Sequence, residues 1–264
     1  FKDYQVVNGI WGSPWVGLKH FTRMFALPKF KRIGGNTFKI SLMSIVLGFP
    51  FPIILAILIN EMVFKKYKRV LQTVYTFPHF LSWVVLAGMA LNLFGDTGVI
   101  KRFAMLFDPG LQDSWNVLYN TQYFRSLLIL TDIWKEGGWG TILYLAAIAG
   151  IDPALNEAAT IDGAGKWKQF FSITVPMITP IIFYNLVTQI CQAFQEFNGP
   201  YIITNGGPRG STTLISLLVY NYAFKSYDMG MASALAWIMF IIVCILTIIA
   251  FTSQKKWVYY SDER

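Results

Sequence analysis

Four long stretches of this 264-residue chain contain no Asp, Glu, Lys or Arg, and they constrain its fold more than any other feature. They are residues 40–59, 70–94, 173–195 and 229–254. About 20 apolar residues in a helix cross the hydrocarbon layer, where lipid offers no partner to an unpaired backbone group. A fifth stretch, residues 127–151, is long enough but carries three charged residues. The sequence therefore predicts an all-α membrane protein, a polytopic helical bundle with five spans in this chain.

The composition agrees with this class and excludes several functions. Only 14% of the residues are charged, against about 25% in soluble domains, and 55% are hydrophobic. The two cysteines, Cys191 and Cys244, lie inside predicted spans without a motif, so we expect them to pack rather than bind metal. The sequence shows no metal-ligand cluster or nucleophile triad, and DGAGKW has Trp167 where a phosphate loop needs Ser or Thr. We expect no enzyme activity and no binding of nucleic acid.

The predicted spans divide the chain into parts. Residues 1–35 form an outer segment, in which residues 17–30 are amphipathic and are expected to lie along the bilayer surface. Residues 36–254 form the transmembrane domain, with an outer loop at 198–228 that holds a short embedded helix. Residues 255–264 form a cytoplasmic tail. Because the chain begins at Phe1 in polar sequence, we expect an upstream segment, a further helix, to precede it.

The most unusual segment is the polar loop at residues 152–173, between two predicted spans. Asp152 is placed to cap a helix that starts at Pro153, since proline suits the first helical position. Two alanines after Glu157 keep the helix surface low enough for a partner to approach. Gly163 and Gly165 then end the helix and turn the chain. The loop is expected to form a short helix that a soluble partner protein binds. The alternative is an ordinary interhelical loop.

The order of residues in this loop resembles the EAA loop of ABC importer permeases. The matching residues are Glu157, Ala158, Ala159, Asp162, Gly163, Ala164, Ile173, Pro176 and Pro180. The resemblance extends to GLKHF at 17–21, NGGP at 205–208 and MGMASALAW at 229–237, which are similar to the maltose and oligosaccharide branch of this family. It implies the type I importer permease fold. It also implies that the ATPase-coupling residues are Glu157, Ala158, Ala159, Asp162, Gly163, Ala164 and Gly165.

Polar side chains inside two spans predict a substrate path, because such groups are costly in a bilayer and usually face a cavity or a partner. Asn185, Gln189, Gln192 and Glu196 recur at intervals of four, three and four, which keeps them on one stripe of a helix. Asp132, Lys135, Glu136 and Trp139 follow the same rule on the preceding span, where Asp132 is placed to pair with Lys135. Amides and carboxylates beside aromatic rings suit hydroxyl-rich ligands. The alternative is a buried polar network that joins helices.

The positive-inside rule does not decide the orientation cleanly. If the loop around Glu157 is cytoplasmic, the basic cluster at 65–69 is also inside, but the outer segments hold slightly more Lys and Arg. Since clustered positive charge attracts anions, the outer excess indicates an acidic substrate or an acidic delivery protein. Contact of residues 17–32 with lipid headgroups is an equally weighted alternative.

These observations predict a multi-pass permease subunit of a binding-protein-dependent ABC importer for oligosaccharides, acidic ones included, in a bacterial-type inner membrane. The resemblance implies as partners a second permease, two cytoplasmic ATPase subunits and an extracytoplasmic solute-binding protein. No cofactor is expected in this chain, because ATP and Mg²⁺ would be bound by the ATPase subunits. The alternatives are an ion-coupled secondary transporter that uses Asp132 and Glu136, and a membrane scaffold that recruits a soluble partner.

Overall fold

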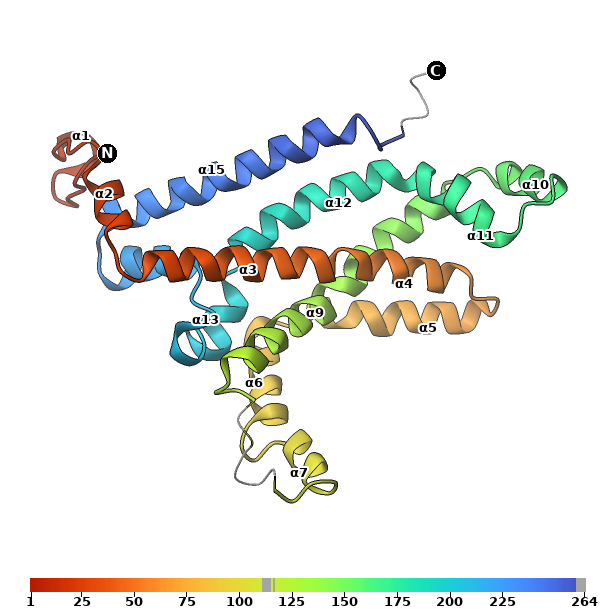
Figure 1. Cartoon of the computed structure of the whole chain (residues 1–264), viewed down its shortest axis with the longest axis horizontal. Coiled ribbons are helices and arrows are strands. Elements are labelled where there is room, and N and C mark those ends of the chain that lie inside the picture. The colour runs from red at the N-terminus through yellow and green to blue at the C-terminus, as the bar shows by residue number, and fades with distance from the viewer. Residues whose placement is uncertain (111–114, 116, 260–264) are drawn as a thin grey trace. The chain divides into compact units, whose positions relative to one another are not determined.

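The computed structural model describes residues 1–110, 115 and 117–259, and its regular structure there is helical apart from two isolated β-bridges near the N-terminus (Figure 1). Four helical stretches are long and apolar enough to cross a membrane: Phe30–Asn60, Trp83–Met105, Lys166–Ile203 and Met229–Gln254. A fifth candidate is Tyr123–Ala149 together with Pro153–Ile161, bent by 65°. The predicted all-helical membrane fold is confirmed.

The order of elements follows the sequence pattern with two differences. The N-terminal helices are α1 (Gly9–Gly12), α2 (Lys19–Phe25), α3 (Phe30–Gly48) and α4 (Pro50–Asn60). Helix α3 thus begins six residues before the expected boundary at residue 36. The later helices are α7 (Val99–Met105), α9 (Thr121–Ala149), α12 (Val175–Gln195), α13 (Asn198–Thr204), η3 (Pro208–Gly210), α14 (Ile215–Tyr220), η4 (Asn221–Lys225) and α15 (Met229–Gln254).

The second difference lies in residues 70–94, where the prediction of one continuous span is wrong. Helix α5 (Lys65–Thr76) continues as η1 (Phe77–Phe80), the backbone is extended at Leu81 and Ser82, and α6 (Trp83–Phe94) then begins. The Ser82 hydroxyl accepts a hydrogen bond from the Val85 N–H and so caps α6. All residues around this break are uncharged, so hydropathy alone did not reveal it.

Contacts divide the chain into two compact units, and the division falls within α3, α9, α12 and α15. The first unit comprises residues 1–43, 82–131 and 192–244. Its core contains apolar side chains from α3, α6, the turn before α9, α9, α13 and the segment before α14: Ile40, Ala87, Leu118, Phe124, Leu127, Leu128, Ile203 and Leu214. In this unit α13 packs against α6, where Gly199 leaves room for Trp83 and Leu128.

A polar network in the first unit holds the NGGP loop in place. Arg125 donates hydrogen bonds to the Asn36 side chain (2.8 Å) and to the Ser211 carbonyl (3.0 Å). Asn36 in turn donates to the Gly210 carbonyl, and the Thr37 hydroxyl accepts from the Ile215 N–H. Glycines at 206, 207 and 210 have positive φ, which allows the loop to turn tightly. Arg125 therefore has a structural role, although its charge contributed to the outer excess.

The amphipathic element at 17–30 is helical as α2, but its polarity differs from the expected pattern. His20 is buried and its Nε2 lies 3.2 Å from the Lys2 carbonyl oxygen, whereas Leu18 and Phe25 are exposed. A side chain at Gly230 would overlap the His20 ring, so the glycine permits this burial. The residues that face outward from α2 are thus partly apolar, which suits an interface with lipid or protein.

The second unit comprises residues 44–81, 132–191 and 245–264, of which 260–264 lie outside the described part. Helices α4 and α5 form an antiparallel hairpin (Figure 1). Glycines of α9 bring this hairpin close: Gly137 lies against Phe51, and Gly138 against the backbone of Tyr75. Small residues at such contacts let membrane helices approach closely. A separate core forms where Phe183 of α12 meets Phe251 and Trp257 edge to face.

Candidate functional site

The short helix in the polar loop is present as α10 (Pro153–Ile161), with the predicted start. The Asp152 carboxylate accepts a hydrogen bond from the Ala154 N–H at 2.9 Å, and Pro153 occupies the first turn. Because α10 bends away from α9 by 65°, it forms a separate short helix after the end of a long one. The sequence thus predicted both the cap and the helix.

The turn after α10 is also built as expected. Asp162 ends the helix, and Gly163 has a φ of +77°, a conformation that side chains disfavour. The Ala164 N–H then returns to the Ala159 carbonyl at 2.9 Å. Gly165 precedes α11 (Lys166–Gln169), which continues as a π-helix, η2 (Phe170–Thr174), into α12. Six of the seven predicted coupling residues therefore lie on α10 or its turn, and Gly165 leads into the next helix.

Gln169 fastens this turn, a role that sequence analysis missed. Its amide nitrogen lies 2.8 Å from the Ala164 carbonyl oxygen and 2.9 Å from the Thr160 hydroxyl. The Thr160 hydroxyl in turn donates to the Asn156 carbonyl. This side chain bridges α10 and α11, so the loop is held as one body. Only the fold brings these residues together, since nine positions separate Thr160 from Gln169.

The surface of the loop is accessible and partly apolar. Glu157 and Ala158 are exposed. Ile161 and Trp167 are 86% and 77% exposed, and the Trp167 ring stacks on Phe171. Large apolar side chains exposed beside small ones are typical of a surface that a protein partner covers.

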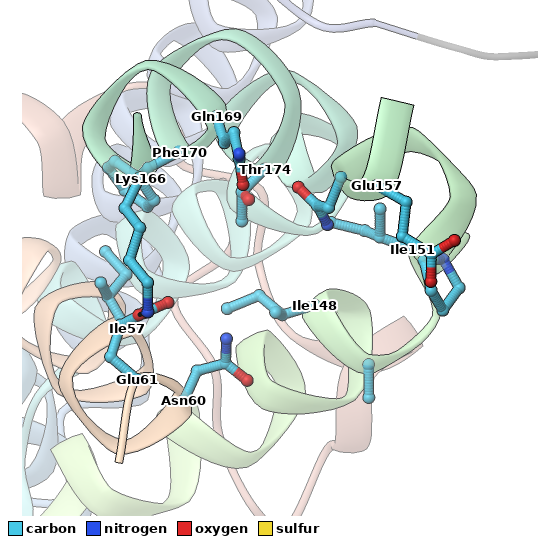
Figure 2. Close-up of a pocket in the computed structure, with 13 residues that line it drawn as sticks. Ile57, Asn60, Glu61, Ile148, Ile151, Glu157, Lys166, Gln169, Phe170 and Thr174 are labelled. Carbon is cyan, nitrogen blue, oxygen red and sulfur yellow. Dashed lines mark hydrogen bonds and ion pairs between the residues drawn. The ribbon is translucent and has the colours of Figure 1, made fainter. Parts of the chain in front are cut away.

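Behind α10 lies a hollow of about 470 Å³ (Figure 2). Its walls come from α4, the end of α9, α10, α11 and η2, and the lining includes Asn60, Glu61, Ile148, Ile151, Asn156, Glu157, Lys166, Gln169, Phe170 and Thr174. Figure 2 shows Lys166 and Glu61 meeting on one side and Glu157 on the other. The Lys166 and Glu61 charged groups are 2.9 Å apart but largely exposed. Such exposed pairs contribute at most about 1 kcal/mol to stability, so this ion pair stabilises the position of the loop only weakly.

All four substrate-path residues of α9 lie in the second unit. Lys135 is buried, with only 8% of its side chain exposed, whereas Glu136 has 44%. The Lys135 ammonium lies 2.9 Å from a Glu136 oxygen and donates to the His79 carbonyl at 2.9 Å. The expected role of Asp132 as the partner of Lys135 is thus taken at least in part by Glu136. Trp139 is half exposed and stacks on the His79 ring at 4.7 Å.

The α12 stripe is split between the units. Asn185 and Gln189 belong to the second unit, where Gln189 donates to the Ser44 carbonyl at 3.1 Å and so joins two helices. The Asn185 amide nitrogen is buried, and its side chain faces the buried Tyr144 hydroxyl. Gln192 and Glu196 belong to the first unit: Gln192 is exposed, and a Glu196 oxygen accepts from the Gly199 N–H at 2.9 Å. Part of the stripe therefore serves helix packing and capping, as the alternative interpretation held.

His79 completes the α9 cluster, and sequence analysis did not assign it to the path. Its Nδ1 lies 2.7 Å from a Glu136 oxygen. Its contacts with Glu136 and Trp139, two predicted path residues, were not foreseen. The available signal was Pro78, which marks a helix break; a side chain next to such a break often contacts another helix.

Comparison with known proteins identifies the family. Residues 40–258 match the family described as "Binding-protein-dependent transport system inner membrane component". The chain is 37% identical over 258 residues to the polygalacturonan/rhamnogalacturonan transport system permease protein YteP of Bacillus subtilis (strain 168), covering 97% of this chain and 79% of the relative.

Solved structures agree with this match. A bacterial ABC transporter involved in the import of the acidic polysaccharide alginate superposes with a TM-score of 0.84 and 33% identity, over 92% of this chain and 85% of that one. The alginate transporter in complex with its alginate pentasaccharide-bound periplasmic protein gives a TM-score of 0.81 and 30% identity, over 91% and 83% of the two chains. This chain belongs to the family of binding-protein-dependent transport system inner membrane components, the permease subunits of ABC importers.

Proposed function

We propose that this permease pairs with a second permease and two cytoplasmic ATPase subunits, and that α10 is the element through which the ATPases move it. The observation that carries this proposal is the capped, accessible helix α10, bent by 65° from α9 and tied to α11 by Gln169. A rigid lever of this kind transmits movement of a bound partner into the long helices. ATP and Mg²⁺ belong to the ATPase subunits, and this chain contributes no catalytic residue.

The substrate in this proposal is a uronate-containing oligosaccharide, delivered by an extracytoplasmic binding protein. The names of the relatives support this class, since alginate and polygalacturonan are both acidic polymers. The net charge of +8 also favours anions. The outer cations are weaker support than the sequence indicated, because Arg125 and Arg23 are engaged within the fold, the latter with Asp228 at 2.6 Å.

The path would be lined by those polar groups that remain accessible. In the second unit, Glu136 and Trp139 meet this condition, since both are at least partly exposed. In the first unit, taken by itself, Gln192 does. Carboxylate, amide and indole groups together bind sugar hydroxyls and stack on sugar rings.

The proposal is tested by co-expressing the chain with a candidate second permease and a candidate ATPase subunit from the same organism and purifying the complex through a tag on this chain. We expect ATPase subunits to co-purify, and ATP hydrolysis to rise when the binding protein and an oligogalacturonide are both added. Omitting the binding protein is the control. Uptake of the saccharide in proteoliposomes that lack ATPase subunits would instead favour an ion-coupled transporter.

The path is tested separately with Gln192→Ala. We expect uptake at limiting substrate to fall roughly tenfold, because a lost hydrogen bond to a bound group costs about 1 to 1.5 kcal/mol. Co-purification of the ATPase subunits should not change. The matched control is Gln195→Ala, three positions along and also exposed. Equal uptake by the Gln192 variant and the wild type would remove Gln192 from the path.

A further inference from the structure

The helical run formed by α5 and η1 ends abruptly at Phe80 in the second unit. The Leu81 N–H bonds back to the Pro78 carbonyl, and the backbone is extended at Leu81 and Ser82. The last carbonyls of a helix have no partners within it, and an unpaired carbonyl in a membrane is costly. The end of this run therefore needs a donor from elsewhere.

Lys135 of α9 supplies this donor. Its ammonium lies 2.9 Å from the His79 carbonyl oxygen, so a positive charge caps the negative end of the helical run. The same ammonium lies 2.9 Å from one oxygen of Glu136. The other Glu136 oxygen lies 2.7 Å from His79 Nδ1, within hydrogen-bond distance. Lys135 thus joins the backbone of η1 to the carboxylate of Glu136.

The residues that follow Lys135 complete the same joint. The His79 ring stacks on Trp139 with an interplanar angle of 10°, and Phe80 meets the Trp139 ring edge to face. Gly138 allows the backbone of α5 to lie directly against α9. The segment Lys135-Glu136-Gly137-Gly138-Trp139 therefore positions the helix break, with Lys135 inside and Glu136 and Trp139 partly exposed.

We propose that Lys135 is a positioning residue for saccharide transport, which acts by fixing Glu136, His79 and Trp139, and that it does not bind the carboxylates of the substrate. This proposal rests on the function proposed above. The decisive contrast is exposure: 8% for the Lys135 side chain against 44% for Glu136. A cation that recognised uronate carboxylates directly would have to be accessible to them.

The test compares Lys135→Met with the wild type in the assembled complex, using two probes: an oligogalacturonide and the same oligomer with all carboxyl groups methyl-esterified. A positioning role raises the half-saturation concentration for both probes by a similar factor, roughly tenfold. Selective loss of the charged probe would show that Lys135 binds carboxylates and would overturn the proposal. Lys66→Met is the control, because Lys66 is exposed at the start of α5.

A second measurement does not depend on transport. Leu81→Cys is introduced into a variant with Cys191→Ala and Cys244→Ala, and the rate at which its thiol reacts with a water-soluble maleimide is measured. We expect the reaction to be at least about threefold faster with Lys135→Met, because the helix end is no longer held, and unchanged with Lys66→Met. An unchanged rate would overturn the positioning role. If the wild type transports neither probe, the proposed substrate class fails, while the labelling rate still decides the role of Lys135.

Discussion

Individual glycines of α9 decide how closely its neighbours pack, and their importance is visible only in the fold. Gly138 lies against the backbone of Tyr75, and a side chain there would overlap the Tyr75 carbonyl group. Backbone atoms of α5 cannot yield without moving the whole helix. Gly88 of α6, in contrast, has open space around the position of an added methyl group.

Gly138→Ala is therefore expected to destabilise the protein by about 1 to 3 kcal/mol, the usual cost of overpacking a close contact. Thermal unfolding of the purified protein in detergent measures this as a lower Tm. Gly88→Ala is the matched control and should leave the Tm unchanged or slightly higher, since alanine favours helix. Equal Tm values for both variants would contradict the close approach of α9 and α5.

At the scale of elements, helix α10 depends on its ends because it is short and exposed. Nine residues cannot form a stable helix by propensity alone. Asp152 satisfies a free N–H at the start, and the turn through Gly163 together with Gln169 secures the other end. The cap, the proline and the glycine have local signals, so the sequence predicted this element. Gln169 has no such signal, because its partners are set by the path of the chain.

Asp152→Ala should weaken α10 by about 1 kcal/mol, which corresponds to roughly fivefold faster hydrogen exchange of the first amides of the helix. Exchange followed by mass spectrometry on peptides covering residues 152–161 measures this. Asp152→Asn keeps an acceptor oxygen and should exchange nearly as slowly as the wild type. If the alanine variant exchanged no faster, the cap would not stabilise the helix.

The break between α5 and α6 shows what a hydropathy pattern leaves undetermined. Residues 70–94 contain no charge, so they satisfy the length test for a span. The chain nevertheless ends one helix at Phe80 and starts another at Trp83, because Pro78 and the Ser82 cap shape the backbone and Lys135 supplies a donor from α9. Side-chain polarity predicts which segments enter lipid, but backbone hydrogen bonds decide where helices end.

At the scale of the whole molecule, the elements assigned to coupling and part of those assigned to the path belong to one unit. The second unit contains α10, the hollow behind it and the cluster around Glu136. The polar network around Arg125 and Asn36 belongs to the first unit and stabilises the NGGP loop. Sequence spacing grouped polar residues along helices correctly, but it did not separate those that bind helix backbones, such as Gln189, from those that remain accessible.

The proposed coupling role of α10 leads to a prediction for the assembled importer. Glu157 is exposed on α10 and lines the hollow behind it, so a reversed charge changes the surface that the proposal assigns to the ATPase without disturbing a buried contact. We expect Glu157→Lys to insert into the membrane at wild-type levels, and either to lose its ATPase subunits or to retain them without stimulation by the loaded binding protein. Uptake should fall at least about tenfold, as for loss of a charged contact.

Glu157→Gln keeps the size of the side chain but removes its charge, so it separates the effect of the lost negative charge from the effect of the larger lysine side chain. Intermediate uptake would indicate that the charge matters, and normal uptake would indicate that the size of the lysine causes the defect. Membrane content by immunoblot, co-purified ATPase and stimulated hydrolysis are measured on the same preparations. Fully stimulated hydrolysis and normal uptake by the lysine variant would mean that Glu157 does not contribute to coupling, because reversing its charge would then have no effect on the ATPase subunits.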